Sequence, residues 1–362
     1  MSAITDAGKR AGMKRVYITC AVLLAVYTVI CILVPDTVVR VLCAILAVLY
    51  AGMKFSSGDT LRYVCKRMLL AIVTVFIIAA ITFFAMNAIP GGPFSSEKAP
   101  SDAVKAVLEQ RFNLDKPLGQ QFTIYVSNML HGDLGVSTKT GRDISQTIAT
   151  KFAVSAKLGG SAALIAIVFG LVFGSVAALN RGKWADRLII FFTTLFVAVP
   201  SFILATLLLL VFCLQLKWVG VWSTSNQNYI LPIIALALYP MSYITRLTKT
   251  SMLDVLGQDY IRTARAKGVK ENKVIFKHAL KNALIPVITY VGPMTAYILT
   301  GSMVVEAVFT VGGLGTEFVT GIGNRDYPMV MGTTIFLATL MVASTLISDL
   351  IYKVVDPKIT FD

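Results

Sequence analysis

Apolar stretches long enough to cross a lipid bilayer recur along this chain, and they constrain its fold more than any other feature. A helical crossing of a hydrocarbon layer about 30 Å thick needs roughly 20 apolar residues. Such stretches occupy 16–34, 68–89, 154–179, 188–216, 230–244, 284–309 and 329–352, and a shorter, weaker one occupies 41–53. With 56% hydrophobic and only 14% charged residues, the composition excludes a soluble globule. We therefore predict an all-α polytopic membrane protein with about eight spans.

Basic residues gather in segments that alternate with these stretches. They are Lys9, Arg10, Lys14, Arg15, Lys54, Arg62, Lys66, Arg67, Arg181, Lys183 and Arg187. The positive-inside rule assigns these segments, and both termini, to the cytoplasmic side of the membrane. The connections at 35–36, 217–229 and 311–328 hold few basic residues and are expected outside, as is the charge-balanced segment 90–152. The net charge of +14 thus describes membrane topology rather than a nucleic-acid surface.

The order of the stretches divides the chain into parts. Residues 1–58 form an N-terminal extension with a predicted transmembrane hairpin, although 41–53 could instead lie in the membrane interface. Residues 59–152 hold the first core span and an extracytoplasmic segment, 153–355 a bundle of five spans, and 356–362 a cytoplasmic tail. Within 90–152, a helix capped at Ser101-Asp102 is either a small folded cap or a solvated amphipathic helix. Gly170 and Gly174 are spaced for close helix packing, which we expect within this chain rather than in a dimer.

Motifs that would indicate chemistry in this chain are weak or missing. Ser95–Lys98 has S-x-x-K spacing and 139–141 reads Lys-Thr-Gly, but the S-D-N element of that enzyme class is absent, so we interpret both as chance. No phosphate-binding G-x-x-x-x-G-K-[ST] motif occurs. His131 and His278 are expected on opposite sides of the membrane, so a protein-built metal site is not predicted. We expect no enzyme activity and no cofactor in this chain.

The five cysteines lie in or beside apolar stretches without C-x-x-C spacing. They are Cys20, Cys31, Cys43, Cys65 and Cys213. We interpret them as packing residues.

One connection between spans carries most of the functional information. Its basic residues are Arg246, Lys249, Arg262, Arg265, Lys267, Lys270, Lys273, Lys277 and Lys281, opposed only by Asp254, Asp259 and Glu271. Apolar residues at 253, 256, 260 and 264 predict a helix that stops at Lys267-Gly268. A second helix follows, with residues 276, 280, 283 and 284 on one side and lysines on another. We call residues 253–284 the basic helix pair. On composition alone it would lie on anionic lipid.

The residue pattern of this helix pair carries more functional information than its composition. Residues 263–268, Thr-Ala-Arg-Ala-Lys-Gly, followed by 276–286, Phe-Lys-His-Ala-Leu-Lys-Asn-Ala-Leu-Ile-Pro, resemble the EAA loop of ABC importer permeases, in particular the dipeptide/oligopeptide branch. Arg262-Thr263 replaces the opening Glu-Ala of the general signature, and the late proline is displaced to Pro286. Further matching segments lie at 90–93, 113–117, 131–137, 199–202, 312–315, 325–328 and 356–358. The resemblance starts near Arg62 and leaves the N-terminal hairpin outside the usual pattern.

The resemblance implies a type I ABC importer transmembrane fold of six core helices, here with an extra N-terminal two-helix hairpin. Residues 153–355 would be the ABC transmembrane type-1 domain. The implied ATPase-docking residues are Asp259, Tyr260, Arg262, Thr263, Ala264, Arg265, Ala266, Lys267, Gly268, His278 and Leu280. The implied partners are a second homologous permease subunit, two ATP-binding subunits that carry ATP and Mg, and an extracytoplasmic substrate-binding protein. The implied cargo is a peptide, with nickel or metal chelates as the alternative in the same family.

Two other classes of membrane protein remain open on the residues alone. An ion-coupled secondary transporter would use buried acids, and Glu306 and Asp349 are the candidates. In a permease these two would be candidate gating residues or packing groups. A non-transporting scaffold could use the basic helix pair for docking but would need no polar path through the membrane.

Overall fold

The computed structural model describes residues 37–55, 59–89 and 114–355. Across these ranges the only β-pairing is an isolated bridge between Val136 and Asp143. The predicted all-α class is therefore confirmed. The chain forms two compact units, residues 1–135 with 360–362, and residues 136–359.

The first unit contains α2 (Thr37–Phe55), α3 (Asp59–Ala88) and α5 (Leu118–Leu130). Phe83 of α3 packs against two rings of α5, with centroids 5.3 Å from Phe122 and 5.7 Å from Tyr125. The predicted hairpin stays a prediction, because its first arm, 16–34, lies outside the described residues. The helix predicted after Ser101 lies outside them as well.

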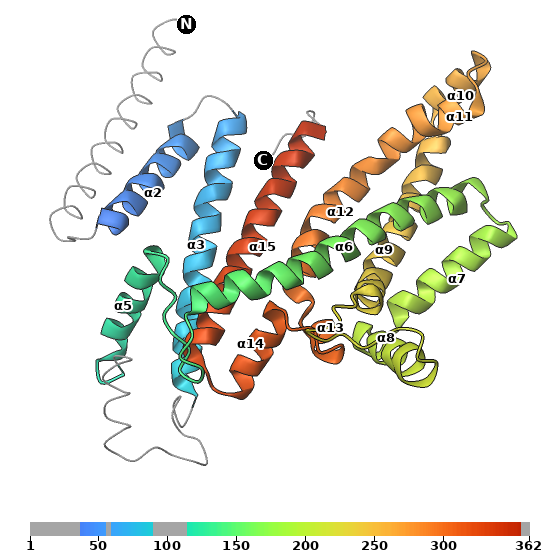
Figure 1. Cartoon of the computed structure of the whole chain (residues 1–362). Coiled ribbons are helices and arrows are strands. Elements are labelled where there is room, and N and C mark those ends of the chain that lie inside the picture. The colour runs from blue at the N-terminus through green and yellow to red at the C-terminus, as the bar shows by residue number, and fades with distance from the viewer. Residues whose placement is uncertain (1–36, 56–58, 90–113, 356–362) are drawn as a thin grey trace, which may run out of the picture. The chain divides into compact units, whose positions relative to one another are not determined.

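The second unit is a helical bundle (Figure 1). Its elements are α6 (Ile144–Leu179), α7 (Trp184–Ala198), α8 (Ser201–Leu208), η1 (Leu209–Gln215, a π-helix), α9 (Ile230–Leu256), α10 (Asp259–Ala266), α11 (Glu271–Lys273), η2 (Val274–Ala279, a π-helix), α12 (Leu280–Gly301), α13 (Met303–Val308), α14 (Leu314–Gly323) and α15 (Tyr327–Val355). In Figure 1, α10 and α11 form one end of this unit, and α8, α13 and α14 lie at the other.

Five helices in the described ranges are long and apolar enough to cross a membrane, and a bent pair brings the number to six if it crosses as one span. The five are Arg62–Ala88, Ile144–Leu179, Ile230–Leu256, Glu271–Val308 and Tyr327–Ser348. They match predicted stretches, although α6 begins earlier than predicted. Asp143 sets that start, since its side chain accepts a 2.7 Å hydrogen bond from the Gln146 N–H. The domain boundary that we place at 152 stays a prediction, and α6 runs across it.

The sequence predicts a single span across 188–216, but the structure contains a sharp bend there. The stretch is α7 followed by α8 and η1, bent by 104°. Val199 leaves the helical conformation with ψ 126°, and Pro200 follows. A proline disfavours helical geometry at the residue before it and supplies no N–H to the preceding turn, which explains the break.

Close contact between α6 and α9 organises the bundle. A Cβ added at Gly170 would lie 2.6 Å from Ile244 Cγ2, and one at Gly174 would lie 2.6 Å from the carbonyl oxygen of Thr245. Only glycine allows the two backbones to approach this closely. The expectation that these glycines pack within the chain is confirmed.

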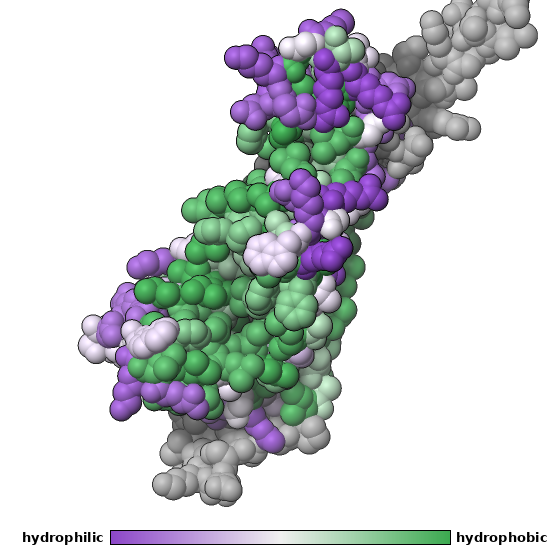
Figure 2. Space-filling model, turned by 90° about the vertical axis from the view of Figure 1, so that its right-hand side faces the viewer, coloured by the Kyte–Doolittle hydropathy of each residue, from purple (hydrophilic) through white to green (hydrophobic). Residues whose placement is uncertain are grey.

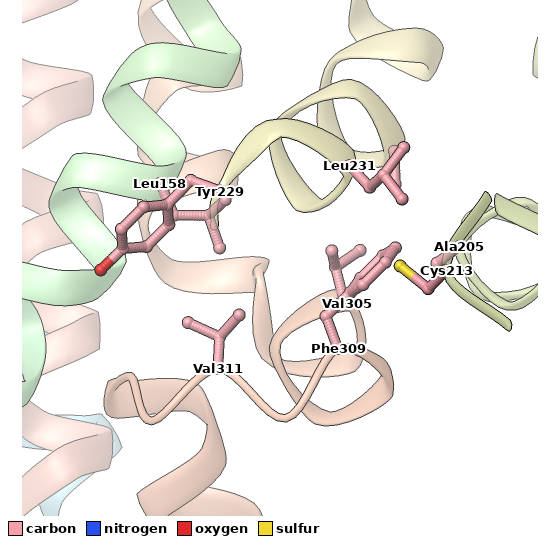
Figure 3. Close-up of a cluster of buried hydrophobic side chains, with 9 residues drawn as sticks. Leu158, Ala205, Cys213, Tyr229, Leu231, Val305, Phe309 and Val311 are labelled. Atoms are coloured by element: carbon pink, nitrogen blue, oxygen red, sulfur yellow. The ribbon is translucent and has the colours of Figure 1, made fainter. Parts of the chain in front are cut away.

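A hydrophobic cluster joins the elements at the end formed by α8, α13 and α14 (Figure 3). Its buried members are Leu158, Ala205, Cys213, Tyr229, Leu231, Ala235, Val305, Phe309 and Val311. They come from α6, α8, η1, α9, α13, the residue before α9 and the segment after α13, so this cluster anchors the loops at that end. Cys213 is a packing residue here, as predicted, and it is a free thiol, as are Cys43 and Cys65.

Candidate functional site

The basic helix pair forms a projecting end of the second unit. Figure 2 shows hydrophobic residues over the middle of one face and hydrophilic residues over the end where Figure 1 places α10 and α11. The helix predicted across 253–264 is interrupted, because α9 ends at Leu256 and α10 starts at Asp259. Helix, glycine turn and second helix then follow as predicted.

The glycine turn has a defined geometry. Gly268 adopts φ +72°, the left-handed region. Its N–H bonds to the carbonyl of Arg265 at 2.9 Å, and the N–H of Val269 bonds to the carbonyl of Ala264 at 3.2 Å. These two bonds are the Schellman arrangement that ends a helix, and Ala264 and Val269 pack on the same hydrophobic cluster. Gly268 therefore fixes the direction in which the second helix leaves.

The predicted docking residues gather on and beside this turn. Asp259, Tyr260, Arg262, Thr263, Ala264, Arg265 and Ala266 form most of α10, Lys267 ends it, His278 lies in η2, and Leu280 starts α12. Most of their side chains are exposed, whereas Ala264, His278 and Leu280 are half-buried. Tyr260 is fixed across the pair, because its hydroxyl accepts a 2.8 Å hydrogen bond from Asn282 Nδ2.

The inner face of the helix pair differs from the predicted one. Its fully buried residues are Ile261, Val274, Ala279 and Ala283, which pack with Met252 of α9. Phe276, predicted to lie with this face, is instead 68% exposed. The π-helix η2 explains the difference, since its wider turn brings residues five apart, such as Val274 and Ala279, onto one side. The tip thus presents an exposed aromatic ring among lysines.

Ion pairs brace the tip. Arg265 donates two hydrogen bonds to Glu271, at 2.6 and 3.1 Å, and so ties α10 to α11 across the glycine turn. The hydrogen bond to Glu271 also raises the pKa of the Arg265 guanidinium. Arg262 lies 3.6 Å from Asp259, one turn away on the same helix. Both pairs are exposed, so they orient side chains more than they stabilise the fold.

An ion pair that the sequence analysis did not identify connects α7 to α9. Asp186 is 6% exposed and forms a salt bridge with Lys249, whose Nζ lies 2.5 Å from its Oδ1. It also accepts a hydrogen bond from the Gly182 N–H at 2.9 Å. Beside it, Arg246 donates to the carbonyl of Thr193 at 3.0 Å. In the sequence, the only sign of this ion pair is that Asp186 is a single acidic residue among the basic residues at 181–187. These contacts link α7 to α9 close to the start of the basic helix pair.

A buried carboxyl group organises the opposite end of the unit. Glu306 is fully buried and accepts hydrogen bonds from Ser155 Oγ at 2.7 Å, from Ser302 Oγ and from the Thr316 N–H at 3.3 Å. Ser155 Oγ in turn accepts the Leu314 N–H at 2.8 Å. Glu306 therefore holds the segment Gly312–Gly315, which we call the glycine loop, against α6.

The carboxyl group of Glu306 occupies space that side chains at Gly313 and Gly315 would otherwise fill. A Cβ at Gly313 would lie 2.5 Å from Glu306 Oε2, and one at Gly315 would lie 2.9 Å from the same atom. At the rim of the loop, Lys151 of α6 pairs with Glu317 of α14 at 2.8 Å.

A second carboxyl group joins two of the segments that carry the family resemblance. Asp326, 4% exposed, accepts hydrogen bonds from Ser137 Oγ and, at 3.0 Å, from both the N–H and the hydroxyl of Thr138. Ser137, the last residue of the segment 131–137, and Asp326 are far apart in sequence and thus meet beside the start of α15. Sequence spacing alone carried no signal for this contact.

The gating roles of the two candidate residues stay predictions. Glu306 is surrounded by hydrogen-bond donors, the environment of a positioning group in the fold. Asp349 lies in α15, but its side chain is outside the described part of the chain. Among the described residues, no group of three or more His, Cys, Asp or Glu could hold a metal ion.

Comparison with known proteins relates this architecture to transport systems. Residues 170–361 match the family model "Binding-protein-dependent transport system inner membrane component", and 60–158 match the model of its N-terminal region. The dipeptide transport system permease protein DppB of Bacillus subtilis is 43% identical over 301 residues, covering 82% of this chain and 97% of that protein. The oligopeptide transport system permease protein OppB of Haemophilus influenzae is 41% identical over 305 residues, covering 83% and 100%.

Solved structures give a more distant likeness. An inward-facing structure of the MetNI methionine ABC transporter aligns at a TM-score of 0.48 and 18% identity, covering 58% of this chain and 96% of that one. The assignment rests on the sequence matches, which span almost the whole length of the relatives. The chain belongs to the family of inner-membrane components of binding-protein-dependent transport systems.

Proposed function

We propose that this chain is the permease subunit of an ABC importer that carries peptides across the cytoplasmic membrane. The observation that carries the proposal is the match at 43% and 41% identity to dipeptide and oligopeptide permeases over 97% and 100% of their lengths. A second permease subunit, two ATP-binding subunits and an extracytoplasmic binding protein complete the importer. ATP and Mg belong to the ATP-binding subunits.

The basic helix pair is the proposed docking element for an ATP-binding subunit. Its projection, exposed lysines and exposed Phe276 support this role, since buried aromatic anchors dominate many protein interfaces. This end of the bundle faces the cytoplasm in the proposal, together with both termini. Movement of the ATP-binding pair would reach α9 and α12 directly, because the helix pair continues into both. The energy enters as unequal binding to inward-open and outward-open states.

The opposite end is the proposed contact surface for the binding protein. There Glu306 holds the glycine loop, and Asp326 holds Ser137 and Thr138 to the segment 325–328. Fixed loops suit a partner that must dock in one orientation, because less conformational entropy is lost on binding.

Reconstitution tests the proposed function. We expect proteoliposomes with the full partner set to take up a labelled tripeptide only when ATP and the binding protein are both present. Uptake driven by an ion gradient without ATP would identify a secondary transporter. ATP-driven uptake of Ni²⁺ or a metal chelate, with no peptide uptake, would identify the alternative cargo. If a complete, assembled partner set took up no substrate, a non-transporting scaffold would be the remaining interpretation.

Replacing Gly268 by valine is expected to weaken association with the ATP-binding subunit while leaving membrane insertion intact. A side chain at φ +72° costs about 1–2 kcal/mol, and a β-branched one more, so the turn would open and redirect the second helix. Copurification of the ATP-binding subunit measures the effect.

Two other variants control for the Gly268 result. Gly257→Ala should behave as wild type, because Gly257 has φ −80° and its added Cβ would meet only ordinary contacts, the nearest at 3.5 Å. Gly268→Asn should be intermediate, since asparagine tolerates the left-handed region better than valine. Equal copurification of Gly268→Val and wild type would refute the docking role of this turn.

Removing the ring of Phe276 is expected to weaken the same association about 30-fold, the loss of roughly 2 kcal/mol typical of an aromatic anchor. The fold should not change, because this ring is exposed. Binding of the ATP-binding subunit to Phe276→Ala in detergent measures the loss. Phe191→Ala, which removes a 64% exposed ring from α7, is the matched control and should retain full affinity. Comparable losses in both variants would argue against an anchor at 276.

A further inference from the structure

The exposed sides of the membrane-spanning helices are of two chemical kinds. On the α6 segment 160–179, every exposed residue is apolar. These residues are Gly160, Leu164, Val168, Phe169, Val172, Val176 and Leu179. The exposed residues described on α12 include no Ala, Val, Leu, Ile, Met or Phe. They are Lys281, Asn282, Pro286, Thr289, Pro293 and Tyr297. The α6 stripe suits lipid, and the α12 stripe does not.

Tyrosines extend the polar stripe of α12 onto α9. Tyr243 of α9 stacks on Tyr290 of α12, with ring centroids 4.2 Å apart and planes at 28°. Tyr239, one turn before Tyr243, and Tyr297, two turns after Tyr290, are 44% and 63% exposed. We call Tyr239, Tyr243, Tyr290 and Tyr297 the tyrosine face.

Two of these rings lie too far inside their apolar stretches for an interfacial aromatic belt. At a rise of 1.5 Å per residue, Tyr239 lies about 14 Å from the first residue of the stretch 230–244, and Tyr290 lies about 9 Å from the first residue of the stretch 284–309. Belt tyrosines lie at the ends of a span. A polar group at that depth needs a hydrogen-bonding partner or water.

Several polar groups of this surface have no such partner in the chain. Within the described residues, no hydrogen bond engages the hydroxyls of Tyr239, Tyr243 or Tyr290. Pro286 and Pro293 lie inside α12 and lack the N–H that would bond the carbonyls of Asn282 and Thr289. The surface therefore offers phenolic hydroxyls, carbonyl acceptors and aromatic rings together.

We propose that the tyrosine face and the adjoining stripe of α12 line the translocation path and contact the peptide during transit. This inference rests on the proposed peptide importer. A peptide presents an N–H donor and a carbonyl acceptor at every residue whatever its sequence. The phenolic hydroxyls, together with the carbonyls of Asn282 and Thr289, to which proline offers no N–H, complement those groups. The stacked rings offer apolar contact to any side chain. The path would therefore recognise peptide backbone, with little preference for side chains.

A photoreactive peptide tests the location of the path. The complete importer, in proteoliposomes with ATP, is illuminated during transport of a tripeptide that carries a benzophenone group, and labelled residues are found by mass spectrometry. We expect label within 239–243 and 286–297, removed by excess unlabelled tripeptide. Label confined to other segments while tripeptide uptake continues would overturn the inference and leave the proposed function intact. Absence of uptake of any peptide by the wild type would remove the proposed function, and the inference with it.

Substitutions separate cargo contact from packing between subunits. The double variant Tyr243→Leu with Tyr290→Leu should lower tripeptide uptake at least about fivefold, the effect of losing one hydrogen bond, with normal copurification of all subunits. Tyr243→Phe with Tyr290→Phe keeps the rings and should fall between the double leucine variant and wild type. Phe191→Leu, on the exposed apolar side of α7, should transport as wild type. Loss of the second permease subunit from the leucine variant would instead identify a subunit interface and refute the path.

Discussion

Replacing Glu306 by alanine is expected to destabilise the protein by about 3 kcal/mol or more. The change removes the acceptor for the hydroxyls of Ser155 and Ser302, which are buried, and for the N–H of Thr316, which is partly buried. It also leaves a cavity beside the glycine loop, against which the carboxyl group packs. Thermal unfolding of the purified protein in detergent measures the loss, and ATP-driven uptake should fall with it.

Glu306→Gln distinguishes hydrogen bonding from general disruption of the core. Glutamine has nearly the same shape, and its oxygen can still accept the Thr316 N–H while its amide faces the two serine hydroxyls, which can rotate to accept. We expect a loss of about 1 kcal/mol, well below that of alanine. If alanine and glutamine were equally tolerated, Glu306 would not be the group that holds the glycine loop.

The transmembrane helices were the most predictable part of the fold. A long apolar stretch in lipid can satisfy its backbone hydrogen bonds only as a helix or a closed barrel, so length and composition were enough for five spans. The stop at Lys267-Gly268 was equally predictable, since glycine is the residue that best tolerates φ +72° at a helix end. In both cases the decisive physics is local along the chain.

Features that depend on partners far away in sequence were not predictable. The exposure of Phe276 follows from a π-helical turn, and the side chains alone do not distinguish that turn from an ordinary one. Asp186 and Asp326 appeared as isolated acids, because Lys249 and Ser137 come next to them only in the folded bundle. Glu306 was identified as a buried acid, but its role in holding the glycine loop required the positions of α6 and α14.

Replacing Gly174 by alanine is expected to cost at least 2 kcal/mol, although alanine favours helix formation by about 1 kcal/mol over glycine. The added Cβ would lie 2.5 Å from Thr248 Cβ and 2.6 Å from the carbonyl oxygen of Thr245. The second of these atoms belongs to the backbone of α9 and cannot rotate away, so the two helices must separate. Because α9 continues toward the basic helix pair, we expect both the melting temperature and the ATP-driven uptake rate to fall.

Gly160→Ala is the matched control on the same helix. A Cβ at Gly160 would meet nothing within 4 Å, so that substitution gains the helix propensity of alanine without a packing cost. Since the two variants add the same methyl group to α6, the difference between their melting temperatures isolates the α6–α9 contact. A Gly174→Ala protein as stable as Gly160→Ala would mean that α6 and α9 do not approach this closely.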